Sequence, residues 1–364
     1  MKTRRIFIGN VAVGNGAKVS IQSMCNTPTA DVAATLDQIR RLAAAGCEII
    51  RLAVPDAAAA EAFKSITAQS PLPVIADIHF DYRLALQSIA NGAAAVRVNP
   101  GNLGGDDAVK AVAKALLESN VPVRVGGNSG SLPKDFQKHL NAANAEEHDE
   151  LLSDALVESV LRQAAAFEKY GVKNIKLSLK ASSVTATVKA YRKIAQRCDY
   201  PLHIGVTEAG TPARGIVKSA IGIGALLLDG IGDTLRVSLT ADPEMEVVAA
   251  MRILESVNLR SASPDIVACP TCGRTKIDLV ALAEKVEKLV NTIKAENGSI
   301  ALKKIAVMGC VVNGPGEARD ADLGIAGGDG KAAVFQRGNI IATISESEGF
   351  ELLEKLIREN TSYN

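Results

Sequence analysis

The chain has 364 residues, of which 47% are hydrophobic, so it is long enough for two or three domains with substantial cores. Its 41 Lys and Arg residues balance 40 Asp and Glu residues, and only 3% of its residues are aromatic, with no Trp. It therefore lacks the basic field and the stacking surface that nucleic-acid binding needs. We expect no nucleic acid among its partners.

The sequence also lacks the signals of membrane insertion and export. It contains no run of about 18 apolar residues, the length that a membrane-spanning helix requires. The opening MKTRRIFIGN has neither the apolar region nor the cleavage site of a secretory signal. Six cysteines in a chain of this length do not form a disulfide framework. We expect a cytoplasmic protein, without membrane contact, whose thiols stay reduced.

Short β-type runs alternate with longer helical runs from residue 19 onward. The predicted strands cover residues 19–24, 48–54, 73–78, 94–99, 121–126, 174–180, 202–208 and 233–239. Eight strand–helix repeats in roughly 250 residues match an α/β fold of the (β/α)8 TIM-barrel type. A doubly wound open sheet is the alternative. It is disfavoured because the first strand is not followed by a G-x-G-x-x-G motif and the chain has no P-loop.

Two further segments complete the predicted organisation. Residues 129–150 are polar and aperiodic, so we expect a long loop after the fifth strand, either a lid or an insertion without a role. From about residue 260 the pattern changes to a helix, a strand, strands joined by Gly-rich turns and a closing helix. We therefore predict a barrel domain over residues 1–260 and a small α+β domain over residues 261–364.

Polar side chains gather where the predicted barrel strands end, which is where barrel enzymes place their active sites. Side chains alternate along a strand, so Thr234, Arg236 and Ser238 share one face of the eighth strand. The candidate substrate contacts at these strand ends are Arg51, Arg97, Arg124, Asn128, Lys176, Lys180, Arg236 and Ser238.

Four arginines and two lysines in one empty pocket would repel one another. Such a ring of half-buried cations is costly unless anions fill it, and only Asp77 and Glu208 oppose it among the strand ends. Arg donates two parallel hydrogen bonds to phosphate. This pattern predicts a small ligand with several phosphate charges, such as a diphosphate. The alternative is that each arginine pairs with a structural carboxylate at the rim.

Three residues at the strand ends are candidates for catalysis. His79 lies beside Asp77, an arrangement that suits proton transfer. Glu208, in GVTEAG, has the chemistry to balance a developing cation or to move a proton. The alternative roles are a structural histidine for His79 and an anchor of cationic side chains for Glu208.

A candidate metal centre lies in the C-terminal region. Cys269 and Cys272 form a C-x-x-C turn, and Cys310 and Glu317 lie in GCVVNGPGEA. Thiolates bind soft metals, and iron–sulfur clusters are held chiefly by cysteine. A carboxylate is a poor permanent ligand of such a cluster, so substrate oxygen can replace Glu317. A structural zinc site and a C-x-x-C redox pair are the alternatives.

Several motifs together resemble one family over nearly the whole chain. They are VSIQSM, ADIHFDYRLAL, VRVNPGN, GVTEAG, KSAIGIGALLLDGIGDTLRVSL, ACPTCGR and GCVVNGPGEA. They closely resemble the hydroxymethylbutenyl diphosphate synthases of the non-mevalonate isoprenoid pathway, in their two-domain bacterial form.

The resemblance implies a TIM barrel followed by a small domain like part of the nitrite and sulfite reductases. It implies a [4Fe-4S] cluster on Cys269, Cys272, Cys310 and Glu317. The implied reaction is two-electron reduction of 2-C-methyl-D-erythritol 2,4-cyclodiphosphate to 4-hydroxy-3-methylbut-2-enyl diphosphate, with flavodoxin or ferredoxin as electron donor.

The family's diphosphate contacts fall on seven of the eight residues chosen above, and Lys180 fits the family pattern better than Lys176. The resemblance also implies a homodimer whose active site is shared between subunits. Because the cluster and the phosphate site lie on different predicted domains, one domain must move over the barrel mouth, and we expect the linker near Ser261 to Pro264 to be the hinge. Two other functions compete with this one. They are a pterin- or phosphate-binding barrel transferase with a structural zinc, and a non-catalytic redox carrier.

Overall fold

A computed structural model of the chain describes residues 2–128, 132, 137, 140, 144–261, 263–296, 298–310, 318–328 and 330–363. Within these residues the chain divides into two compact units, Met1–Leu259 and Arg260–Asn364. Each unit has its own hydrophobic core.

The N-terminal unit is a parallel barrel, which confirms the predicted fold class. Its strands are β3 (Ser20–Met24), β4 (Ile49–Ala53), β5 (Val74–Asp77), β6 (Ala95–Arg97), β7 (Val123–Asn128), β8 (Ile175–Lys180), β9 (His203–Ile204) and β10 (Thr234–Leu235). The hydrogen-bonded order is β8-β7-β6-β5-β4-β3-β10-β9, and every pairing is parallel. A parallel bridge between Leu177 and Leu202 joins β8 to β9 and closes the ring.

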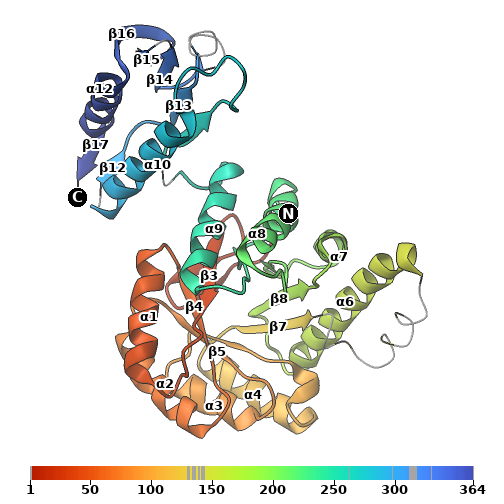
Figure 1. The fold of residues 1–364 in the computed structure, drawn as a ribbon. Helices are drawn as coiled ribbons and strands as arrows, with labels where there is room; N and C mark the ends of the chain where they lie inside the picture. The colour runs from red at the N-terminus through yellow and green to blue at the C-terminus, as the bar shows by residue number, and fades with distance from the viewer. Residues whose placement is uncertain are drawn as a thin grey trace. The chain divides into compact units, whose positions relative to one another are not determined.

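Helices cover the outside of the barrel strands (Figure 1). They are α1 (Val32–Ala44), α2 (Ala57–Gln69), α3 (Tyr82–Ala90), α4 (Asp106–Glu118), α6 (Ala145–Glu168), α7 (Val184–Arg197), α8 (Pro212–Leu228) and α9 (Pro243–Ser256), with a 3-10 turn at Pro100–Asn102. Asp31, Asp56, Asp81 and Ser183 cap four of these helices by accepting backbone N–H bonds. These caps set where each helix begins after its loop.

The eight predicted strands are all present, but β9 and β10 are shorter than residues 202–208 and 233–239. Backbone contact continues past them, since Arg236 N–H donates to Ile204 O at 3.1 Å. At Gly205 a Cβ atom would lie only 2.4 Å from Arg236 O and 2.7 Å from Lys180 Nζ. Glycine therefore lets the two backbones and a lysine approach one another closely at this end of the barrel.

The predicted loop over residues 129–150 needs a correction, because α6 already begins at Ala145. Asn144 starts this helix, since its Oδ1 accepts the N–H of Glu147 at 2.9 Å. The described residues of its first turns are exposed or half-buried, which accounts for their polar character, and Glu150 pairs with Lys189 and Lys193 of α7. Most of residues 129–143 lie outside the described part of the chain. The structure therefore does not test the prediction that this segment is a lid.

An N-terminal β-hairpin, which the sequence patterns did not predict, closes one end of the barrel. Strands β1 (Ile6–Ile8) and β2 (Val11–Val13) pair antiparallel. Their buried side chains pack against Ile49, Ile75 and Ala95, which lie at or next to the first residues of β4, β5 and β6. The hairpin therefore seals the amino-terminal end of the barrel, opposite the strand ends that carry the predicted site.

The C-terminal unit is the expected small α+β domain. A five-stranded sheet runs in the order β11 (Asp265–Ala268), β13 (Lys304–Met308), β14 (Leu323–Gly328), β15 (Lys331–Gln336) and β16 (Asn339–Ser345). Helices α10 (Leu279–Ala295) and α12 (Glu346–Glu359) pack on it, and β12 (Gly298–Ile300) pairs with β17 (Thr361–Tyr363). The β11, β13 and β14 ladders are parallel, whereas β15 and β16 continue the sheet antiparallel.

The hairpin seal can be tested with two neighbouring residues. Replacing Ile8, which is fully buried, with Ala should lower the free energy of barrel unfolding by about 2–5 kcal/mol, because it leaves a cavity at the barrel end. The matched control is Phe7→Ala, since Phe7 lies on the same strand with 56% of its surface exposed. Urea unfolding followed by circular dichroism measures both. Equal, small shifts for the two variants would show that the hairpin does not stabilise the barrel.

Candidate active site

Six basic side chains lie on, or directly after, neighbouring barrel strands, with Arg124 and Lys176 near the beginning of β7 and β8 and the others farther along their strands. We call this set the cationic cup: Arg51, Arg97, Arg124, Lys176, Lys180 and Arg236. The register explains how they meet, since Arg97 aligns with Arg124 across β6 and β7, and Arg124 aligns with Lys176 across β7 and β8. Arg124, Lys176 and Lys180 are buried, and the other three are nearly so.

Two buried carboxylates contact the cup. Asp77 Oδ1 lies 3.0 Å from Arg97 Nη1, and its Oδ2 lies 3.6 Å from Arg51 Nε. Burial opposes the ionisation of Asp77, but Arg51, His79 and Arg97 together hold its pKa well below its usual value. Glu246 of α9 pairs with Arg236 at 3.1 Å. Among the described residues, the four arginines of the cup outnumber these two carboxylates, so the cup keeps a positive charge whichever form its two lysines take.

The arginines of the cup have buried N–H groups that no described residue satisfies. Arg51 Nε, Arg97 Nε, and both Nε and Nη1 of Arg124 lack a hydrogen-bond partner. Arg124 donates only through Nη2, to Ser178 Oγ at 3.0 Å. Buried donors are normally satisfied, and an orphaned one is costly. The cup is therefore shaped to receive hydrogen-bond acceptors carrying negative charge, as phosphate oxygens do.

Deeper in the barrel, a buried polar layer lies beneath the arginines. Lys176 Nζ is 3.4 Å from both Gln22 Oε1 and Thr234 Oγ1, and His203 Nδ1 is 2.9 Å from Thr234 Oγ1. Burial, and then the charge of Arg124, holds the pKa of Lys176 and of His203 well below the usual values. His203 is thus a neutral imidazole, and Lys176 serves this layer rather than the mouth.

The other predicted residues lie at different depths of the barrel mouth. His79 is exposed, with Nε2 at 3.0 Å from Arg97 Nη1 and 3.7 Å from Asp77 Oδ2. Glu208 is also exposed and has positive φ (51°), a strained backbone for a non-glycine residue in the loop after β9. Ser238 is half-buried beyond β10. Asn128 ends β7, and its side chain lies outside the described part of the structure.

In the C-terminal unit, two predicted metal ligands follow neighbouring parallel strands. Cys269 comes directly after β11, and Cys310 comes two residues after β13, in a ladder that aligns Ala268 with Val307. Gly309 N–H donates to Cys269 Sγ at 3.2 Å. A Cβ on Gly309 would lie 2.9 Å from the Thr275 side chain, so glycine permits this approach. The strand ends therefore bring the two cysteine loops together.

The third cysteine has the chemistry of a ligand. Cys272 is exposed, and hydrogen bonding by the backbone of Arg274, then by its side chain, lowers the pKa of the thiol. Glu317 lies outside the described residues. Among those described, no three His, Cys, Asp or Glu side chains are close enough together to hold a metal ion. The donor types fit an iron–sulfur cluster, and the cluster itself remains a proposal.

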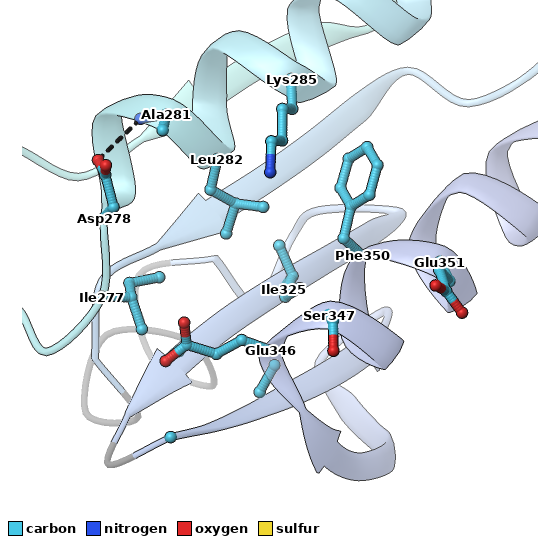
Figure 2. Close-up of a pocket in the computed structure, with 13 residues that line it drawn as sticks. Ile277, Asp278, Ala281, Leu282, Lys285, Ile325, Glu346, Ser347, Phe350 and Glu351 are labelled. Atoms are coloured by element: carbon cyan, nitrogen blue, oxygen red, sulfur yellow. Dashed lines mark hydrogen bonds between the residues drawn. The ribbon is translucent and has the colours of Figure 1, made fainter.

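A groove of about 680 Å³ also lies in the C-terminal unit, between the first turns of α10 and α12 and the strands β14 and β15 (Figure 2). Its charged side chains are Asp278, Lys285, Glu346 and Glu351. One lysine among three carboxylates does not suit an anionic ligand. Size alone therefore does not make this groove the phosphate site, and the cationic cup is the better match.

Family comparisons agree with the two-unit organisation of the chain. Residues 3–251 match the model of the GcpE TIM-barrel domain, and residues 265–359 match that of the GcpE protein C-terminal domain. The chain belongs to the GcpE family. No helix in the described part of this GcpE chain has the length and hydropathy needed to span a membrane.

Curated GcpE relatives match over nearly their whole length. A protein of Geobacter sulfurreducens is 53% identical, with 98% of this chain and 99% of the relative covered. Proteins of Maridesulfovibrio salexigens and Clostridium perfringens are each 49% identical, with 98% of this chain and 96% and 98% of the relatives covered. All three are named 4-hydroxy-3-methylbut-2-en-1-yl diphosphate synthase (flavodoxin).

Sequence reasoning missed two residues of this GcpE site, His203 and Glu246. His203 lies in a strand where every neighbour is buried, so its own burial was predictable but its place beneath the cup was not. Glu246 lies in a helix, where a charged residue normally faces solvent. One signal was available: Glu246 falls on the apolar stripe of α9 with Pro243, Ala250 and Ile253.

The lysines of the cup predict proton uptake when an anion binds. Burial, and then Arg124, Arg236 and Arg51, holds the pKa of Lys180 well below its usual value, although Glu246 opposes this. A bound anion raises that pKa, so the complex holds more protons than the free protein. The affinity of the cup for the anion should therefore fall as the pH rises from the pKa of Lys180 in the free protein toward the pKa of Lys180 in the complex.

Calorimetry with the cyclic diphosphate measures this uptake directly, since the heat then depends on the ionisation enthalpy of the buffer. The ligand keeps one strongly acidic oxygen on each phosphorus, so it does not itself titrate near neutral pH. Lys180→Met should reduce the uptake, whereas Lys189→Met, at a surface pair with Glu150, should not. Identical heats in two different buffers would contradict the prediction.

Proposed function

We propose that this GcpE protein reduces 2-C-methyl-D-erythritol 2,4-cyclodiphosphate to 4-hydroxy-3-methylbut-2-enyl diphosphate in isoprenoid precursor synthesis, with two electrons delivered through a [4Fe-4S] cluster. The observation that carries this proposal is sequence identity. Over 98% of the chain, about half of the residues are identical to those of relatives named for this reaction product. The cup independently supports a diphosphate ligand, because it offers buried cations with unsatisfied N–H groups.

The reaction balances when an external electron donor supplies the reducing electrons. With substrate and product both written as fully protonated acids, the reaction consumes two electrons and two protons. The bond between carbon and one ring phosphate oxygen breaks, and one hydroxyl leaves as water. The opened diphosphate oxygen becomes an anion. Arg51, Arg97, Arg124, Lys180 and Arg236 stabilise that charge in a site already arranged for it. Asn128 and Ser238 complete the proposed contacts, while Lys176 supports them from below.

The proposed catalytic residues have different tasks. Asp77 is held as a carboxylate by its arginine neighbours, so it orients Arg51 and Arg97 rather than donating a proton. His79 and Glu208 are exposed at the mouth, so they are accessible for delivering the proton that turns the hydroxyl into water. We assign proton transfer to these two.

Cys269, Cys272, Cys310 and Glu317 are the proposed ligands of the cluster, which supplies electrons one at a time when bound. Three thiolates and one carboxylate make the fourth position the one that substrate can displace, so Glu317 is also a proposed catalytic residue. We also propose that the reaction takes place in the cytoplasm, because a reducing compartment keeps these thiols free to bind the cluster. The relatives' names support flavodoxin as the electron donor.

Replacing Glu317 with Cys tests the exchangeable ligand. We expect anaerobic protein to keep its iron and sulfide, because four cysteines suit such a cluster, but to lose turnover and the substrate-induced change in its EPR spectrum. The matched control is Glu351→Cys, on the exposed surface of the same unit, which should keep all three properties. Full turnover by the Glu317 variant would remove the exchangeable-ligand role, and zinc in place of iron would remove the cluster.

We also propose that the protein works as a homodimer. Helices α8 and α9 carry exposed apolar side chains around a largely apolar groove of about 530 Å³. The exposed residues are Ile216, Val217, Ile221, Met245 and Val248. Contiguous apolar surface of this kind marks an interaction site, and a second copy of the chain is the occupant that we propose.

The oligomeric state can be tested by placing one charge on this face. Ile221→Glu should convert a dimer to a monomer in sedimentation velocity, because it buries an unpaired carboxylate in the contact. Leu117→Glu is the control, since Leu117 is equally apolar and exposed but lies on α4. A dimeric Ile221 variant would place the contact elsewhere.

A further inference from the structure

One buried carboxylate outside the barrel strands holds a cation of the cup. Glu246 lies in the first turn of α9, yet only 4% of its surface is exposed. Its Oε2 accepts from Arg236 Nε at 3.1 Å, and its Oε1 accepts from Arg236 Nη2 at 3.3 Å. This two-point contact fixes the plane of the guanidinium as well as its position.

The same carboxylate also fixes the backbone next to a second predicted ligand contact. Glu246 Oε1 accepts the N–H of Leu239 at 2.9 Å, and Leu239 directly follows Ser238. The next N–H, that of Thr240, donates to Gly210 O at 3.0 Å. One side chain thus ties together Arg236 and the chain segment that carries Ser238.

The opposite edge of the Arg236 guanidinium is left for a ligand. Arg236 Nη1 lies 3.6 Å from Met24 Sδ, and Arg51 Nη2 lies 3.0 Å from the same sulfur. A thioether is a weak acceptor, so neither guanidinium is strongly satisfied there. Two cations that converge on one weak acceptor are poised to bind a shared anionic oxygen.

We propose that Glu246 is a positioning residue for diphosphate binding, acting through Arg236 and through the backbone beside Ser238. The inference deepens the proposed function and rests on it, because Arg236 must contact the diphosphate. Glu246 touches neither the substrate nor the reacting atoms. It directs the free edge of Arg236 toward them.

Charge alone predicts the opposite result, which makes the inference testable. Glu246 offsets the mutual repulsion of Arg51, Lys180 and Arg236. If it acted only as a counter-charge, its removal would make the cup more positive and anion binding tighter. If it positions Arg236, its removal weakens binding, because the guanidinium loses its orientation. The sign of the change in Kd separates the two roles.

The experiment measures the Kd of the cyclodiphosphate for the full chain by calorimetry, together with KM and kcat. Glu246→Gln removes the charge, and Glu246→Asp keeps the charge but shortens the reach. Both variants should weaken binding about tenfold or more and raise KM more than they lower kcat. The control is Glu244→Gln, in the same helical turn, where the carboxylate pairs with Arg41 and not with the cup. It should bind as the wild type does.

A double-variant cycle shows whether the effect passes through Arg236. Arg236→Met should weaken binding by itself, and adding Glu246→Gln should cause little further loss. If the losses of binding free energy in the two single variants add up in the double variant, the inference is overturned. The same holds if both single Glu246 variants bind the cyclodiphosphate as tightly as the wild type or more tightly. Neither result affects the proposed function. A wild-type protein that binds the cyclodiphosphate but never reduces it would overturn the proposed function and leave the positioning role standing. Unfolding midpoints establish that each variant is folded.

Discussion

Repulsion among buried cations is the constraint on which this site depends. Six Lys and Arg side chains gather on neighbouring barrel strands, and two buried carboxylates among the described residues contact them. Charge buried without full compensation is costly, so a fold keeps it only where another group offsets the cost. The unsatisfied N–H groups of Arg51, Arg97 and Arg124 indicate that this group is a ligand. In the proposed function, the diphosphate supplies the negative charge that this balance requires.

The surrounding structure holds these charges in place. Parallel strands bring Arg97, Arg124 and Lys176 into register on neighbouring strands, so their convergence follows from the ladder itself. Apolar packing of the N-terminal hairpin seals the opposite end of the barrel. Asp77, on a barrel strand, pairs with Arg51 and Arg97, and Glu246, on a covering helix, pairs with Arg236. Each carboxylate fixes the direction of a guanidinium and leaves other N–H groups for a ligand.

In the C-terminal unit, parallel strands likewise bring together residues that are far apart in the sequence. Cys269 and Cys310 follow adjacent parallel strands, and adjacent parallel strands also carry most of the cationic side chains in the barrel. Parallel strands gather residues from distant parts of the sequence at one edge, and the loops there are free to adopt irregular backbone. Glycine matters at this edge because Gly309 lets one loop approach the other closely enough for its N–H to reach Cys269 Sγ.

By itself the sequence determined the barrel, the order of its eight strands, the small second domain and the identity of most candidate ligands. These follow from local patterns: hydrophobic periodicity, glycine stops, and cations at alternating positions near strand ends. Tertiary structure decided which cations are paired. The burial of Glu246 and its contact with Arg236 depend on how α9 docks, and the polar layer of His203 and Lys176 depends on closure of the barrel. The hairpin of two three-residue strands was too short for its pattern to be recognised. Pairing and burial are relations between residues far apart in the chain, and local periodicity does not encode them.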